Sequence, residues 1–195
     1  SRGLGDVYKR QIPDLISLTG GNNAFTAKLD TFFTVNYQSG ELNDNASGFV
    51  GQYAHGNEPS HHVAYLYACA GEPWKTQKYV AHIMNELYND SSSGYAGNDD
   101  CGEMSAWYVF GALGFYPVNP VSGKYIIGTP MLEEAVIQLP DGKTFTIKAP
   151  RKEHNEIYIR SMRLNGKKYT KNYITHQDIM NGGTLEFVMT ASPGK

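Results

Sequence analysis

The amino-acid sequence predicts an α+β protein, with helices in the first part of the chain and antiparallel strands in the second. Between residues 12 and 118, apolar residues recur every three or four positions, as they do on the buried face of a helix. After Pro117 the pattern changes to short β-branched or aromatic runs separated by turn residues. We therefore expect a helical region over residues 12–118 and a β-rich region over residues 119–195.

The first region contains four segments that combine helical spacing with recognisable ends. Ser60 is a suitable N-cap for a helix that stops at Gly71, because a serine hydroxyl can accept a free backbone amide and glycine tolerates the left-handed stop. Pro73 suits the first turn of the next helix, where no backbone N–H is needed. The expected helices cover residues 24–33, 60–70, 73–89 and 102–113.

The second region contains short runs typical of strands. Turn signals such as Pro140-Asp-Gly and Asn165-Gly separate these runs. Residues such as Val136, Phe145 and Ile147 show partial alternation, which indicates a sheet packed on one face. The expected strands cover residues 124–127, 134–139, 144–149, 156–164 and 184–189.

Residues 1–11 are set apart from the rest of the chain. Their sequence, SRGLGDVYKRQ, shows no pattern that continues into the following helix, and DVYKRQ resembles the translation of an adapter used in sequencing libraries. We expect this stretch to be a non-native leader and leave it out of the fold reasoning. The chain is then expected to be a fragment whose natural upstream portion precedes Ile12.

Composition excludes two classes of partner. The net charge of −2 and the lack of a Lys/Arg stripe argue against binding to nucleic acid. No run approaches the roughly 20 apolar residues of a membrane span. The aromatic content of 12% suits a protein that stacks sugar rings, but it also suits a large core.

The two cysteines, Cys69 and Cys101, leave the cellular compartment open. They could form a disulfide in an oxidising compartment. Both also lie in or beside apolar helical sequence, where a buried free thiol is equally expected.

The run GNDDCG at residues 97–102 places two carboxylates directly before a predicted helix. Free backbone amides and the helix dipole at that position favour an ionised carboxylate. Such a group can take a proton from water, as an inverting glycoside hydrolase requires opposite its leaving group. The alternative is that one aspartate only caps the helix. Trp107, further along this helix, fits a core better than a sugar platform.

The run HGNEPSHH at residues 55–62 holds three imidazoles, an amide and a carboxylate. Glu58 and a neighbouring carbonyl or amide offer the hard oxygen donors that Ca²⁺ prefers. His61 and His62 would point about 100° apart on a helix, which makes them a poor zinc pair. The alternative is again structural, with Ser60 as a cap and one histidine buried in a core.

At these residues the chain resembles a known family. The segments GQYAHGNEPSHHVAYLY and GYAGNDDCGEMSAWYVFGALGFYPV, preceded by AKLDTFF, are similar to the C-terminal part of glycoside hydrolase family 92, the calcium-dependent exo-acting α-mannosidases. The resemblance covers nearly everything from Ile12 onward. It implies a β-sandwich followed by an (α/α)6 barrel, of which this chain would hold the last helices and the closing β segment. It also implies an inverting mechanism and a periplasmic or secreted protein.

The resemblance also assigns roles to single residues. Asp100 corresponds to the general base, and a companion carboxylate would stand at Asn98, where this sequence departs and Asp99 is the candidate replacement. Glu58 corresponds to a calcium ligand, with Asn57 as a second one. The remaining set, expected to shape the sugar pocket, is His55, His61 and His62. The catalytic acid would lie before Ile12, in the missing N-terminal part that is the expected partner of this chain.

Two other classes of function remain open from the sequence. The β-rich region could be a carbohydrate-binding module that uses tyrosine and tryptophan faces. The chain could also be an assembly domain whose polar loops only cap helices. The enzyme reading requires that Asp100 and Glu58 lie near one another, and the other two do not.

Overall fold

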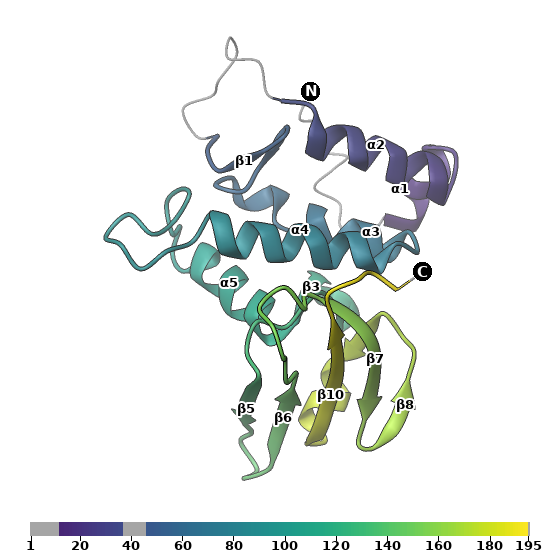
Figure 1. Cartoon of the computed structure of the whole chain (residues 1–195), viewed down its shortest axis with the longest axis vertical. Helices are drawn as coiled ribbons and strands as arrows, with labels where there is room; N and C mark the ends of the chain where they lie inside the picture. The colour runs from purple at the N-terminus through teal and green to yellow at the C-terminus, as the bar shows by residue number, and fades with distance from the viewer. Residues whose placement is uncertain (1–11, 37–45, 195) are drawn as a thin grey trace.

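Helices form one layer of the molecule and strands form another (Figure 1). The computed structural model describes residues 12–36 and 46–194. The predicted leader, residues 1–11, lies outside the described residues. The mixed content of helix and antiparallel sheet agrees with the predicted α+β class.

Three of the four predicted helices are confirmed. Asn22–Thr34 forms α2, Pro73–Glu86 forms α4, and Glu103–Leu113 forms α5. Pro73 is at the start of α4, where its missing N–H costs nothing. A short helix that was not predicted separately, α1 (Ile12–Leu18), precedes α2. In the described part of the chain, no helix is both long and apolar enough to span a bilayer.

The helix predicted over residues 60–70 is confirmed only in part, since an α-helix covers only its last turn before Gly71. The segment forms two 3-10 turns, η3 (Glu58–Ser60) and η4 (Val63–Tyr65), followed by α3 (Leu66–Cys69). The Ser60 hydroxyl donates to the carbonyls of Ala54 and Asn57 and caps no helix.

A contact far away in the sequence explains this irregular geometry. The indole N–H of Trp107 donates to the carbonyl oxygen of His61 at 3.0 Å. An α-helix would offer that oxygen to the amide of Tyr65, which donates to His62 instead. Tertiary contact therefore replaces local helix propensity here.

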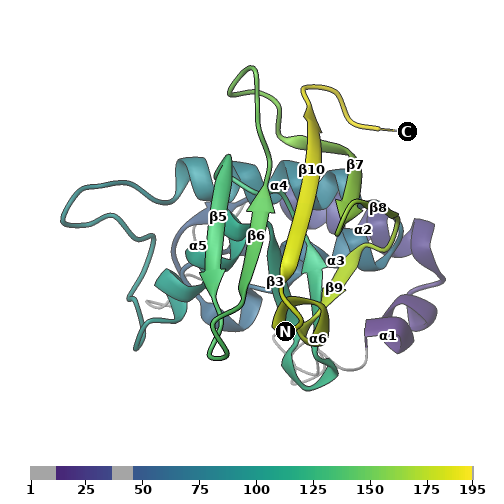
Figure 2. The same cartoon turned by 90° about the horizontal axis from the view of Figure 1, so that it is seen from below.

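All five predicted strands are found, and further short strands accompany them. A five-stranded sheet has the order β5-β6-β10-β7-β8, and a three-stranded sheet has the order β3-β4-β9 (Figure 2). β10 runs parallel to β6, which corrects the expectation of a purely antiparallel region. The strands are β1 (Phe49–Val50), β2 (Tyr53–Ala54), β3 (Phe115–Asn119), β4 (Lys124–Ile127), β5 (Glu134–Gln138), β6 (Thr144–Lys148), β7 (Tyr158–Leu164), β8 (Lys167–Tyr169), β9 (Tyr173–Thr175) and β10 (Gly183–Thr190).

Two apolar cores correspond to the two layers. One joins α1 to α5 and contains fully buried aromatic rings such as Tyr65, Tyr67 and Trp107. The other lies between the sheets and the short helix α6 (His176–Met180), around Phe145, Leu185 and similar residues. Phe110 of α5 packs against both cores, so α5 connects the layers. β3 starts at Phe115, a few residues before the boundary expected near residue 118.

Candidate active site

The two polar motifs lie against each other. Gly56, from the histidine-rich motif, and Gly97, from the acidic motif, are in direct backbone contact. A β-carbon at Gly97 would lie 2.9 Å from both the Cα and the carbonyl oxygen of Gly56. Real β-carbons essentially never come so close to backbone atoms, so both loops require glycine here. This contact places the loop that carries Glu58 beside the loop that carries Asp100. That the two side chains face a common cavity stays a prediction.

A buried imidazole, that of His55, links the histidine-rich motif through Tyr88 to α5, the helix that follows the acidic motif. His55 is fully buried; its Nδ1 lies 2.8 Å from the Tyr53 hydroxyl and its Nε2 lies 2.6 Å from the Tyr88 hydroxyl. Tyr88 donates its own proton to the carbonyl of Met104 in α5. The Tyr88 oxygen therefore accepts from Nε2–H, and Nδ1 accepts from Tyr53. This arrangement satisfies the neutral ring and gives no place for a second proton.

The protonation of His55 follows from its surroundings. Burial, and secondarily the nearby His61, lowers the pKa of His55 from 6.5 to about 3. The two imidazole rings stack at 4.7 Å, and the His55 ring meets Trp107 edge-on at 4.4 Å. His55 is therefore neutral at any pH at which a glycosidase ordinarily works.

The other two histidines of the motif are also in the core. His61 has no exposed surface and His62 is 4% exposed. The His61 Nε2 is 3.0 Å from the carbonyl oxygen of His55, and its Nδ1 is 3.7 Å from a carboxylate oxygen of Glu103. The three rings support the motif loops from inside. The role at a sugar pocket that the sequence assigned to them stays a prediction.

The two aspartates of the acidic loop have different surroundings. The Asp99 carboxylate accepts from the backbone amide and the hydroxyl of Ser105, at 3.0 and 2.5 Å. Ser105 is the third residue of α5, so Asp99 satisfies one of the free amides at the start of that helix. The capping alternative is therefore correct for Asp99.

Asp100, in contrast, is exposed at the tip of the loop. Its backbone amide donates to the side-chain oxygen of Asn98. Within residues 12–36 and 46–194, no hydrogen bond or ion pair engages its carboxylate. Asp100 and Cys101 both adopt left-handed backbone angles, with φ of 48° and 59°, which is costly for residues with a β-carbon. The loop thus holds Asp100 outward at the N-terminus of α5.

The predicted calcium ligands are only a partial set. Glu58 is half-buried at the start of η3, and Asn57 before it is exposed. Calcium requires six to eight oxygen ligands. The segments that the structure describes hold no group of three His, Cys, Asp or Glu side chains able to bind a metal. These residues do not form a calcium site by themselves, although they could supply two of its ligands.

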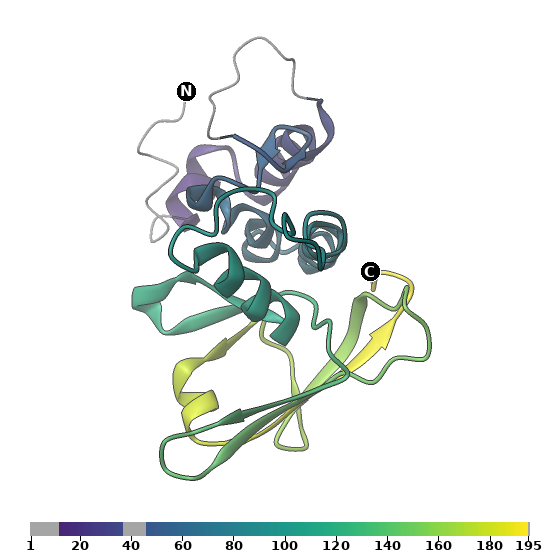
Figure 3. The ribbon, with the colours of Figure 1, turned by 90° about the vertical axis from the view of Figure 1, so that its left-hand side faces the viewer.

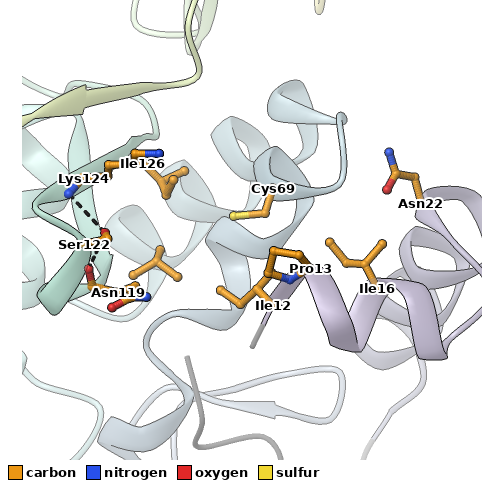
Figure 4. Close-up of a pocket in the computed structure, with 10 residues that line it drawn as sticks. Ile12, Pro13, Ile16, Asn22, Cys69, Asn119, Ser122, Lys124 and Ile126 are labelled. Atoms are coloured by element: carbon orange, nitrogen blue, oxygen red, sulfur yellow. Dashed lines mark hydrogen bonds between the residues drawn. The ribbon is translucent and has the colours of Figure 1, made fainter. Parts of the chain in front are cut away.

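A cavity of about 390 Å³ lies elsewhere, between α1 and the three-stranded sheet (Figure 4). Its lining residues include Ile12, Ile16 and Lys124, and none belongs to either motif. Cys69 also lines it, and burial raises the pKa of this thiol to about 11. Both cysteines are free, so they do not form the disulfide that the sequence left open.

Three residues of this arrangement were not foreseen from the sequence. Tyr88 lies 33 positions from His55, and no local signal connects them. Ser105 and Glu103 occupy the first turn of α5. Their polar character in an otherwise apolar helix was the sequence signal that could have identified them. Trp107 is 1% exposed, which confirms its assignment to the core.

The low pKa of His55 predicts acid sensitivity. As the pH falls from about 6.5 towards 3, the unfolded chain binds a proton that the folded chain does not. Each such proton contributes about 1.4 kcal/mol per pH unit to the fall in the free energy of unfolding. Urea unfolding between pH 6.5 and 4.5 should show a flatter dependence for His55→Gln. His82→Gln, on the exposed face of α4, should keep the wild-type slope. A His55 ring that titrates near 6.5 by NMR would contradict this.

Comparison with known proteins agrees with these motifs. A family model described as the glycosyl hydrolase family 92 catalytic domain matches residues 7–191. The match begins inside the stretch that we set aside as a leader. An uncharacterized secreted glycosidase of Arthroderma benhamiae is 36% identical over 178 residues, which are 90% of this chain and 21% of that protein.

Solved structures give the same result. The family GH92 α-mannosidase BT3965 of Bacteroides thetaiotaomicron matches with a TM-score of 0.83 and 43% identity, over 89% of this chain and 23% of that one. The family GH92 inverting mannosidase BT2199 of the same species matches with a TM-score of 0.81 and 41% identity, over 93% of this chain and 26% of that one. The chain thus spans about a quarter of these relatives. It belongs to glycoside hydrolase family 92, as part of the catalytic domain of that family.

Proposed function

We propose that this chain is part of an inverting, calcium-dependent exo-α-mannosidase that hydrolyses terminal α-mannosides of glycans. The observation that carries the proposal is the exposed Asp100 carboxylate before α5, in a loop whose Gly97 packs on Gly56 of the Glu58 loop. The α-mannosidases among the matched structures support the substrate class. The word "secreted" in the name of the Arthroderma relative supports a secreted or periplasmic location.

The rest of the catalytic machinery is proposed to lie in the part of the protein that this chain does not include. The chain spans 21% of the secreted glycosidase and 23% of BT3965. We assign the other helices of an (α/α)6 barrel and the catalytic acid to that upstream part. In this division, residues 12–118 supply the last barrel helices and residues 119–195 supply the closing β region.

In the proposed reaction, Asp100 acts as the general base. Its carboxylate takes a proton from a water molecule, and the water oxygen attacks the anomeric carbon of mannose from the face opposite the leaving group. The bond from that carbon to the glycosidic oxygen breaks, and the upstream acid gives its proton to the leaving oxygen. The configuration at the anomeric carbon is inverted. Because Asp99 already holds Ser105, Asp100 is the free carboxylate of the pair.

Asn98 has a positioning role in this proposal. Its side-chain oxygen holds the backbone amide of Asp100 at 3.2 Å. A carboxylate at this position could accept the same hydrogen bond, so the replacement of an acid by an amide preserves the turn. The amide at residue 98 carries no negative charge and cannot take the proton from water together with Asp100. Asp100 therefore works as a single base.

Calcium is proposed as a cofactor of the whole protein. Glu58 and Asn57 would supply two of its oxygen ligands, and the upstream part would supply the others. Such an ion would bind hydroxyl groups of the mannose ring and favour its distortion.

Substitution of the two aspartates distinguishes their roles. In the full-length enzyme, Asp100→Asn should lower kcat by about 10²- to 10⁴-fold, because an amide cannot take the proton from water. Asp99→Asn is the matched control, since asparagine caps helices as well as aspartate does, and it should keep both Tm and most of the activity. Equal losses of kcat in the two variants would show that Asp100 is not the single base.

The 195-residue chain alone should release no mannose above background. It would lack the catalytic acid, whose contribution is about 10²- to 10⁴-fold, and also the contacts that position the sugar. The measurement is mannose release from an α-mannoside, with a full-length family member assayed at the same molar concentration. Turnover comparable to that of the full-length protein would overturn the proposed division of the site.

Removal of a calcium ligand should abolish stabilisation by calcium. A saturating ligand at 100 times its Kd raises stability by about 2.7 kcal/mol, which thermal unfolding detects readily. In the full-length enzyme, chelation should lower Tm, and Glu58→Gln should remove most of the shift on adding calcium back. Glu86→Gln, at the exposed end of α4, should leave the shift intact. A full calcium shift in Glu58→Gln would remove Glu58 from the metal site.

A further inference from the structure

Beyond its first turn, which holds Glu103 and Ser105, helix α5 is almost wholly apolar, unlike the other long helices. Its sequence EMSAWYVFGAL contains one charged residue, Glu103. α4 by comparison exposes polar side chains, such as Lys78, His82 and Asn85, and buries its apolar ones. A helix that is apolar all round is normally buried on every side. α5 lies between helices α1 to α4 and the strands (Figure 3). It buries Met104, Trp107 and Ala112, whereas Ala106, Tyr108 and Val109 are exposed.

The uncovered side of α5 carries apolar and aromatic side chains, with the polar Glu103 and Ser105 at its N-terminal end. Val109 is 56% exposed and Tyr108 is 38% exposed, and Ala106 is also exposed one turn earlier. The Tyr108 ring lies 4.8 Å from the Tyr88 ring, which in turn meets the half-exposed Tyr95 at 6.0 Å. We call Tyr95, Ala106, Tyr108 and Val109 the α5 face. Its first residue in α5, Ala106, follows Asp100 by six positions.

The exposed face of the five-stranded sheet has a different character. Its register places Glu134, Lys148, Glu186 and Arg163 in one row across four strands, with the sign of the charge alternating. Alternating charges across strands are typical of a solvated sheet face. Val188 follows Glu186 by two residues in β10, on the same face of the sheet, and is 49% exposed. An exposed valine therefore occurs in both settings. On β10 it shares its face with charged residues, whereas on α5 it lies beside the exposed Ala106 and Tyr108.

We propose that the α5 face is the docking surface for the upstream part of the same polypeptide. This inference rests on the proposed function, in which the chain is one part of a longer enzyme. About three quarters of each matched mannosidase lies outside the segment that this chain spans, which provides the occupant. Because α5 begins three residues after Asp100, the segment docked on this face also lies beside the general base.

Lysine substitution at Val109 tests this surface, with Val188→Lys as the matched control of similar exposure. In the 195-residue chain, neither change should alter Tm, because both side chains face water. In the full-length protein, Val109→Lys should lower Tm and soluble yield, since it would bury an unpaired charge. Val188→Lys should change neither. Backbone amides of residues 103–113 should also exchange more slowly in the full-length protein than in the chain.

Two outcomes would overturn the proposal. One is an unchanged Tm for Val109→Lys in the full-length protein together with equal amide exchange in the two forms. The other is a dimer of the 195-residue chain that Val109→Lys dissociates, which would make a second copy the occupant. Neither measurement depends on catalysis. A result that rejects the α5 face as a docking surface can therefore be distinguished from a result that rejects Asp100 as the general base.

Discussion

The contact between Gly56 and Gly97 is the constraint on which the rest of the site depends. Backbone atoms of two loops, far apart in sequence, approach so closely that neither position has room for a β-carbon. The contact sets the distance between the loop that carries Glu58 and the loop that carries Asp100. His55, the residue before Gly56, adds a second link between the same parts of the chain. Its imidazole bonds the Tyr88 hydroxyl, which donates to the carbonyl of Met104 near the start of α5. The candidate site needs both motifs, and the packing of their backbones at Gly56 and Gly97 holds the two loops together.

Aromatic residues serve this packing rather than an open sugar platform. Tyr53, Tyr65, Tyr67 and Trp107 are all at most 1% exposed. The Trp107 ring meets His55 and Tyr65 edge-on, and Tyr67 stacks on Tyr79. Their large buried area stabilises the helical layer by the hydrophobic effect, and the indole and phenol groups provide directed hydrogen bonds within it. These four rings therefore belong to the core, whereas Tyr95 and Tyr108 are 45% and 38% exposed. The same low-polarity surroundings keep His55 neutral.

Sequence patterns predicted what depends on neighbouring residues. The helices α2, α4 and α5 and the five main strands follow from periodicity and end signals, and the polar runs before helices correctly marked the two loops that meet. The helix expected over residues 60–70 is irregular in its first half, because Trp107, 46 positions away, takes the carbonyl of His61. The parallel pairing of β10 with β6 has no local signal, since strand direction is decided by the path of the whole chain. Asp99 and Asp100 look equivalent in sequence, and only the position of Ser105 separates a cap from a free carboxylate.

The acidic loop shows how local strain and local capping act together. Asp100 and Cys101 adopt left-handed angles that cost free energy, and such angles persist only where the surroundings impose them. Here Asn98 holds the amide of Asp100, and Asp99 fixes the first turn of α5 through Ser105. These neighbours determine the backbone of Asp100, while no partner among the described residues holds its carboxylate. The backbone is thus ordered in advance, and only the side-chain torsions would remain to be fixed in the proton transfer proposed for Asp100.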